Sequence, residues 1–217
     1  MAESLLSLDT FETGALTELV NLGASRAAGA LRQLAGGPVS IAAPAVSLIS
    51  HARAVEALSQ AGQGPFAAVM LKFWGDFTGS ALLVVPSARL LELTRVVLAE
   101  STVPDEVAGM ESEVLAETGN ILLNAYLGTL ANMLQRTLNV ALPELLAGDG
   151  HAIFSRCSPA GGGDLVISQS IDFALKGRNT SGHLAVILDI PSLKAFKALL
   201  GEFAARAGGA GVTFRRV

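Results

Sequence analysis

Two segments of the chain carry the same helical pattern. Residues 14–34 read GALTELVNLGASRAAGALRQL, and residues 113–133 read EVLAETGNILLNAYLGTLANM. A shift of 99 residues (113 − 14) aligns them without a gap, and the match continues to residues 44 and 143. The identities are Leu16/Leu115, Glu18/Glu117, Asn21/Asn120, Gly29/Gly128, Leu31/Leu130, Ala42/Ala141 and Pro44/Pro143. Such a repeat predicts a single domain over 1–217, built of two similar halves at about 9–100 and about 104–207.

The elements around the repeat predict an α+β fold. Each half is expected to form a long helix, several strands and a second helix, with the halves related by a pseudo-two-fold axis. Strands joined by hairpins favour an antiparallel central sheet, whereas a doubly wound parallel sheet would need a helix between most strands. The expected helices span residues 9–36, 87–98 and 192–207, with a further long helix that ends at 135 and begins at either 104 or 110. The expected strands span 39–41, 46–49, 66–73, 80–85, 138–141, 152–155, 165–174 and 183–188.

The first long helix has a recognisable start and one apolar face. Asp9 can cap it, and Glu12 stands three residues later, as in a capping box. Apolar residues recur at helical spacing at positions 11, 15, 19, 22, 23, 27, 30, 31 and 34. The pattern therefore predicts an amphipathic helix.

Composition excludes several classes of protein. The chain is 51% hydrophobic and 16% charged, yet its two uncharged stretches contain Gly and Pro (33–52) or regularly spaced Asn (118–135), which argues against a membrane span. The acidic start MAESLLSLDTFE lacks the features of a signal peptide, so we expect a cytoplasmic protein. A net charge of −4 argues against nucleic-acid binding, and the single cysteine, Cys157, excludes an internal disulfide.

Each long helix carries a Glu and an Asn away from its apolar side. Glu18 and Asn21 are three residues apart, about 60° around the helix, and Glu117 and Asn120 repeat this spacing. Asn is a poor helix former, because its amide competes for backbone hydrogen bonds. A solvated helix face explains one such pair, but two pairs at equal repeat positions indicate a functional site. Two more polar residues, Glu113 and Asn124, fall in the same arc of the second helix.

These stretches resemble the two signatures of the CheC family of chemotaxis phosphatases, which act on phosphorylated CheY-like response regulators. Residues 18–31 resemble the first signature and residues 117–130 the second. The family pattern begins with an Asp or Ser. A Glu follows four residues later, an Asn stands three residues after the Glu, and a Pro comes after twenty-two further residues. Pro44 and Pro143 stand at that last position, where we expect turn-formers that support the site. The resemblance extends over about residues 11–201 and includes WGDFTGSALLV at 74–84.

The chain departs from the family pattern mainly in its first half. Where the pattern has Asp or Ser, this chain has Gly14 in the first half and Glu113 in the second. The usual Gly-Asn after the first signature is Ser25-Arg26 here. Because Gly14 brings no side chain, we expect the first site to be the weaker one.

The resemblance implies how the sites work. Asn21 and Asn120 would enter the regulator's active site and orient a water molecule that attacks the aspartyl phosphate. Glu18 and Glu117 would pair with the regulator's active-site lysine, and Glu113 would brace the second site. No cofactor or metal ligand is expected from this chain, since the regulator brings its own Mg²⁺.

Other readings remain open from the sequence. The rival to an enzyme is a non-catalytic CheC-like adaptor that docks on a response regulator or on a CheD-like deamidase. A flagellar-switch subunit related to FliY is a weaker alternative, because the chain has no extra binding domain. The three histidines are isolated, and Cys157 has no His or Asp pattern that would make it a nucleophile.

Overall fold

The computed structural model describes residues 8–35, 39–42, 46–61, 64–98, 109–157, 165–175 and 178–209. The first half contains α2 (Thr10–Ala35), β1 (Val39–Ala42), β2 (Val46–Ser50), α3 (His51–Ala61), β3 (Phe66–Gly75), β4 (Gly79–Pro86), the 3₁₀ turn η1 (Ser87–Arg89) and α4 (Leu90–Leu98). The second half contains α6 (Glu111–Leu134), β5 (Leu138–Val140), β6 (Glu144–Gly148), α7 (Gly150–Ser155), β7 (Leu165–Leu175), β8 (Arg178–Leu188) and α8 (Ile190–Gly209).

The eight strands in the described part of the chain join one antiparallel sheet. The strand order is β1-β7-β8-β4-β3-β5, with β2 also paired to β7 and β6 also paired to β3. The hairpins β3–β4 and β7–β8 meet at the centre, where β4 pairs with β8 from Gly79↔Leu188 to Val84↔His183. The expected antiparallel sheet is confirmed, and the parallel alternative is excluded for the described strands.

The two halves exchange strands across the sheet. The short strands β1 and β2 of the first half pair with β7 of the second, while β5 and β6 of the second half pair with β3 of the first. Each half therefore completes the sheet of the other. This reciprocal arrangement is the predicted pseudo-two-fold relation, with its axis between β4 and β8.

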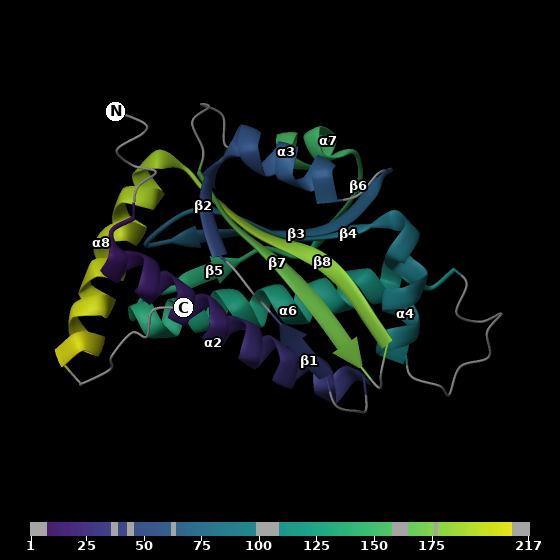
Figure 1. Ribbon diagram of the computed structural model, residues 1–217, viewed down its shortest axis with the longest axis horizontal. Helices are drawn as coiled ribbons and strands as arrows, with labels where there is room; N and C mark the ends of the chain where they lie inside the picture. Colours follow the sequence, from purple (N-terminus) through teal and green to yellow (C-terminus); the bar gives the residue numbers. More distant parts are fainter. Residues whose placement is uncertain are drawn as a thin grey trace.

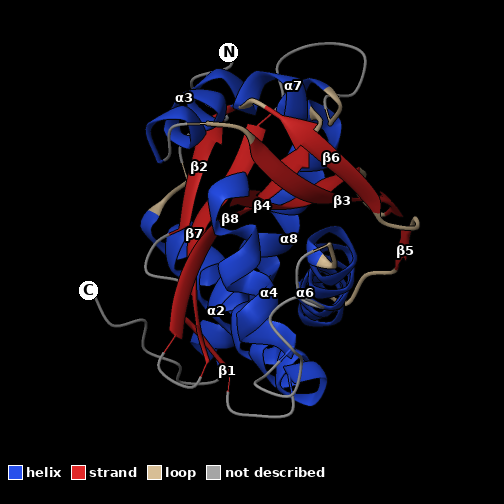
Figure 2. Cartoon of the chain, turned by 90° about the vertical axis from the view of Figure 1, so that its right-hand side faces the viewer, coloured by secondary structure: helices blue, strands red, loops and turns tan. Residues whose placement is uncertain are grey.

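Helices cover both faces of the sheet, in three layers (Figures 1 and 2). The long helices α2 and α6 lie with α4 and α8 on one face, and the short helices α3 and α7 lie on the other. Successive residues of β3 pack on opposite faces of the sheet. Val69 and Leu71 belong to the core between the sheet and the helices α2 and α6, whereas Ala68 and Met70 belong to the core between the sheet and the helices α3 and α7. The sheet is thus buried on both faces, which explains its nearly continuous apolar strands.

The start of α2 has the predicted capping box. The Asp9 amide donates to the Glu12 carboxylate at 3.0 Å, and the Glu12 amide donates to Asp9 Oδ1 at 2.8 Å. The apolar stripe is largely confirmed, since positions 15, 19, 23, 27 and 31 are buried. Phe11 is an exception: its side chain is 67% exposed, one turn before the helix reaches the core.

Three elements between the long helices and the hairpins differ from the prediction. The helix α3 was not predicted; among its residues 51–60 only Ala54 and Leu58 are buried, so its apolar signal is short. The strand β6 was also missed, because ELLAG favours a helix by composition and becomes a strand by pairing with β3.

The strand predicted at 152–155 is wrong, since these residues lie in α7. Asp149 caps that helix, and its Oδ1 accepts a hydrogen bond from the Ala152 amide at 2.7 Å. The aromatic and β-branched residues at 153 and 154 suggested a strand, but the cap and the burial of Ile153 and Phe154 beneath the sheet favour one and a half turns of helix.

Candidate functional site

The first candidate pair lies on the outer face of α2. Glu18 and Asn21 are both exposed, while the neighbouring Leu19 and Val20 are buried against the sheet and α6. Neither polar side chain has a hydrogen-bond or ion-pair partner among the described residues. The carboxylate and the amide of this pair are therefore available to another molecule.

The second pair occupies the equivalent place on α6. Glu117 is exposed and Asn120 is partly exposed, whereas Leu115 and Leu122 are buried below them. Glu113 is exposed one turn earlier, so α6 presents two carboxylates on one face near its beginning. The helix dipole favours negative charge in the first turn, where Glu113 lies, and neither carboxylate has a counter-ion within the described part of the chain.

Asn120 differs from Asn21 in having an internal partner. Asn124 Nδ2 lies 2.8 Å from Asn120 Oδ1 and 2.8 Å from the Asn120 backbone oxygen, so it donates to both groups. An amide oxygen has two lone pairs, and the Asn120 amide nitrogen has no partner among the described residues. Asn120 therefore keeps one acceptor position and two donors for a ligand.

Two glycines let the site-bearing helices pack closely. A Cβ at Gly23 of α2 would lie 2.7 Å from the ring of Tyr126 on α6. A Cβ at Gly119 of α6 would lie 2.5 Å from Val69 Cβ on β3. Gly119 thus allows α6 to pack closely on β3, one residue before Asn120.

The two pairs form separate sites. Glu12, near the start of α2, and Arg136, just after α6, both make ion pairs with α8, through Lys197 at 3.8 Å and Glu202 at 3.7 Å respectively. The helices α2 and α6 are therefore antiparallel, as Figure 1 shows. Since each pair lies in the first half of its own helix, the sites face solvent toward opposite ends of the α2–α6 layer.

The supporting residues predicted from the sequence have mixed outcomes. Pro143 lies in the loop between β5 and β6 and is partly buried, whereas Pro44 lies outside the described residues. Ser25 and Arg26 are exposed on α2, one turn after Asn21. Among the described residues Arg26 has no carboxylate partner, so it adds an unpaired positive charge beside the first site.

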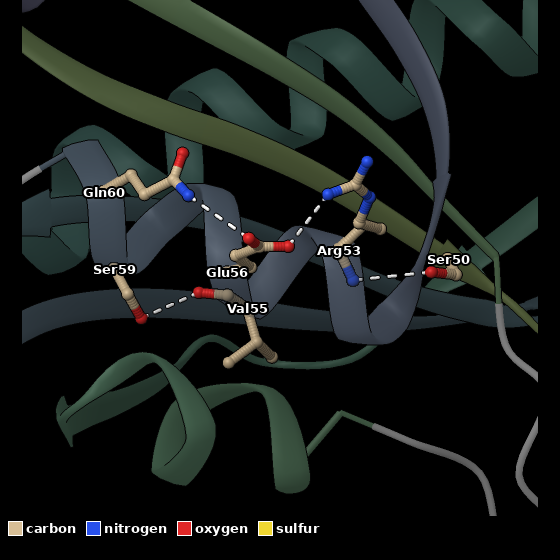
Figure 3. Close-up of polar contacts among 6 residues, drawn as sticks. All are labelled: Ser50, Arg53, Val55, Glu56, Ser59 and Gln60. Atoms are coloured by element: carbon tan, nitrogen blue, oxygen red, sulfur yellow. Dashed lines mark hydrogen bonds and ion pairs between the residues drawn. The ribbon is translucent and has the colours of Figure 1, made fainter.

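A groove on the opposite face of the sheet has a different character. It has a volume of about 380 Å³ and runs between α3 and the strands β2 and β7. Its charged groups bind one another: Arg53 forms an ion pair with Glu56 at 3.0 Å, and Gln60 donates to Glu56 at 3.2 Å (Figure 3). The groove lies on the other face of the sheet from both Glu–Asn pairs, and its charged side chains, Arg53 and Glu56, are paired with each other, so it is the weaker candidate.

The remaining reactive groups are poorly placed for chemistry. Cys157 is buried, and burial raises the pKa of its thiol to about 12, so the thiolate form is rare at neutral pH. Burial likewise raises the pKa of the Tyr126 hydroxyl. No group of three or more His, Cys, Asp or Glu side chains within the described ranges could hold a metal ion. In the same ranges no helix has both the length and the apolar character needed to cross a bilayer.

Comparison with known proteins gives the site a context. No family model matches the chain. The CheY-P phosphatase CheC of Bacillus subtilis is 28% identical to it over 193 residues, which cover 86% of this chain and 92% of CheC. The chain resembles the CheC phosphatases.

Solved structures with the same fold include FliY and the middle domain of FliM. FliY of Thermotoga maritima matches with a TM-score of 0.67 at 14% identity, over 90% of this chain and 98% of FliY. The middle domain of FliM from H. pylori matches with a TM-score of 0.58 at 9% identity, over 88% of this chain and 99% of that domain. These matches confirm the predicted CheC-like fold, which FliY and FliM share.

The sequence located the polar residues on the outer faces of α2 and α6, and the structure confirms that they are exposed or partly exposed. What it missed is the bond between Asn124 and Asn120. The four-residue spacing of these two asparagines was the available signal, because residues four apart are neighbours on a helix.

Proposed function

We propose that this chain is a phosphatase that accelerates hydrolysis of the aspartyl phosphate of a CheY-like response regulator. The observation that carries the proposal is the outward Glu–Asn pair, present at matching positions of α2 and α6. The similarity to CheC over most of both chains supports the same assignment.

The proposed chemistry is attack by water on the phosphoryl group. A water molecule forms a bond to phosphorus, the bond between phosphorus and the aspartyl oxygen breaks, and the products are inorganic phosphate and the regulator's carboxylate. An aspartyl phosphate is a reactive anhydride, and phosphoryl transfer depends mainly on positioning and electrostatics. The regulator's Mg²⁺ would neutralise charge on the phosphoryl oxygens.

The Asn side chains suit the positioning of water. The amide oxygen of Asn21 or Asn120 accepts a hydrogen bond from the water, while the amide nitrogen donates to oxygen atoms nearby. An amide is uncharged, so it does not repel the phosphoryl oxygens as a carboxylate would.

The Glu side chains provide docking. Glu18 and Glu117 would each form a charge-assisted bond with the lysine in the regulator's active site, a contact worth about 1.5–3 kcal/mol. Their lack of a counter-ion among the described residues means that no existing pair has to break first. Glu113 adds negative charge next to the second site.

The test is the timed loss of phosphate from phosphorylated CheY-like regulators, with and without this protein. We expect the protein to accelerate the loss and the double variant Asn21→Ala/Asn120→Ala to remove the acceleration. Binding of the variant to the regulator should change little, because the glutamates remain. Unchanged turnover in the double variant would exclude the mechanism.

The alternative is a non-catalytic adaptor that binds a regulator or a CheD-like partner. One observation favours it: position 14 of the first site is a glycine, which has no side chain to support Glu18 and Asn21. An adaptor would bind the phosphorylated regulator without shortening the lifetime of its phosphate. Co-purification with candidate partners would then identify what it binds.

A further inference from the structure

The second site contains a hydrogen bond that the first site lacks. Asn124 Nδ2 donates to both the side-chain oxygen and the backbone oxygen of Asn120, each at 2.8 Å. The residue at the equivalent position of α2 is Ser25 (124 − 99), which has no hydrogen bond to Asn21 among the described residues. The two sites therefore differ in how firmly their amides are held.

The bond restrains the amide that contacts the water. The contact with the Asn120 backbone oxygen fixes the position of the Asn124 amide, and the bond to Oδ1 then favours one orientation of the Asn120 amide, since rotation away breaks it. The orientation of the amide is thereby set before a partner arrives. A side chain that is already ordered loses less freedom on binding, and a correctly oriented group raises the rate of the chemical step.

The bond also determines which atoms of Asn120 remain available. One lone pair of Oδ1 is used by Asn124, and the second lone pair and both N–H groups remain. Donation to Oδ1 polarises the amide, which strengthens its N–H groups as donors. The remaining atoms are those that can accept from a water molecule and donate to phosphoryl oxygens.

We propose that Asn124 is a positioning residue that holds the Asn120 amide in its water-orienting geometry. This inference rests on the proposed phosphatase function. Asn124 does not itself contact the reacting atoms; it acts through Asn120.

If Asn124 only supported the fold, its replacement by Ala would lower the melting temperature of the protein. Asn124 is exposed in the middle of α6, where Asn is a poor helix former and Ala the best. Replacing it by Ala should leave the melting temperature unchanged or raise it. A loss of turnover without a loss of stability therefore separates positioning from support of the fold.

The experiment measures kcat and KM for dephosphorylation of a CheY-like regulator phosphorylated by a small phosphodonor. Asn124→Ala should lower kcat about threefold with KM unchanged, because ordering the amide affects the chemical step. Asn124→Asp should lower kcat further, since a carboxylate cannot donate to Oδ1 and would attract the amide nitrogen instead. Asn132→Ala, another exposed Asn on α6, is the matched control and should keep full turnover.

A gain-of-function variant provides an independent test. Ser25→Asn places the missing amide one turn after Asn21, at the position equivalent to Asn124. In the Asn120→Ala background, which leaves only the first site intact, Ser25→Asn should raise the residual kcat about threefold.

The outcomes separate this inference from the proposed function. If Asn120→Ala does not reduce turnover, the proposed function itself fails. If Asn120→Ala reduces turnover and Asn124→Ala matches Asn132→Ala, the positioning role is overturned and the phosphatase remains. A fall in kcat for Asn124→Ala that is matched by a lower melting temperature also overturns it.

Discussion

The outer faces of α2 and α6 carry the same Glu–Asn pair in different surroundings. On α6, Glu113 adds a second carboxylate, and Asn124 holds the Asn120 amide. On α2 the equivalent positions are Gly14 and Ser25, so Glu18 and Asn21 have neither neighbour. Arg26 adds a positive charge on α2 where α6 has Ala125.

This difference shows that a repeated motif does not make two equal sites. The residues that would do the chemistry are identical in the two halves, but the groups that orient them are present in only one. Since positioning supplies much of the rate in phosphoryl transfer, we expect the α6 site to provide most of the activity.

The largest expected effect is that of Asn120→Ala. Removing this amide should lower stimulated dephosphorylation tenfold or more, about 1.4 kcal/mol of transition-state stabilisation, while binding to the regulator changes little. Timed phosphate release and a titration of the regulator's beryllofluoride adduct would measure the two quantities. A loss of binding equal to the loss of turnover would contradict an orienting role.

The next largest effect is on the stability of the fold, at the two glycines where the long helices pack closely against other elements. Gly119→Ala places a methyl group against Val69, and the overpacking of about 1–3 kcal/mol exceeds the gain of about 1 kcal/mol in helix propensity. We expect a net loss of about 1 kcal/mol in the free energy of unfolding, and a similar loss for Gly23→Ala against Tyr126.

The matched controls for these glycines lie on the same helices. No described atom is within 4 Å of a Cβ added at Gly29 or Gly128, so Ala at either position should stabilise its helix by about 0.5–1 kcal/mol. Denaturant unfolding of the four variants would check the signs. Stabilisation by Gly119→Ala would mean that α6 does not pack on β3 as closely as described.

The smallest expected effect is that of Asn21→Ala. If the sites act independently and Asn120→Ala removes nine-tenths of the activity, then Asn21→Ala can remove only about a tenth. Initial rates at saturating phosphorylated regulator would measure it. An equal or larger loss than that of Asn120→Ala would reverse the comparison and show that Gly14 does not weaken the first site.

Local signals in the sequence were enough for the elements that contain them. The capping box at Asp9 and Glu12 and the apolar spacing of α2 located that helix within a residue at each end. The elements α3, β6 and α7 were missed or wrong, because six to eleven residues of helix or five of strand carry little periodicity. Their form depends on contacts with β2, β3 and the sheet face.

The glycines illustrate where a repeat can mislead. Gly29 and Gly128 are identical in the two halves, yet no described atom requires a glycine at either place. Gly23 and Gly119 have no glycine at the equivalent position, yet both lie against side chains of another element. Which glycine matters depends on packing between α2, α6 and β3, which no spacing along the chain reveals.

The sequence by itself determined the two halves, the long helices and the residues on their outer faces, because helical periodicity and a 99-residue repeat are properties of the chain. The tertiary structure decided that the halves exchange strands, that α2 and α6 are antiparallel, and that the two sites are apart. These features arise from pairing and packing between residues far apart in the chain, where many arrangements satisfy the same local preferences and the buried core selects one.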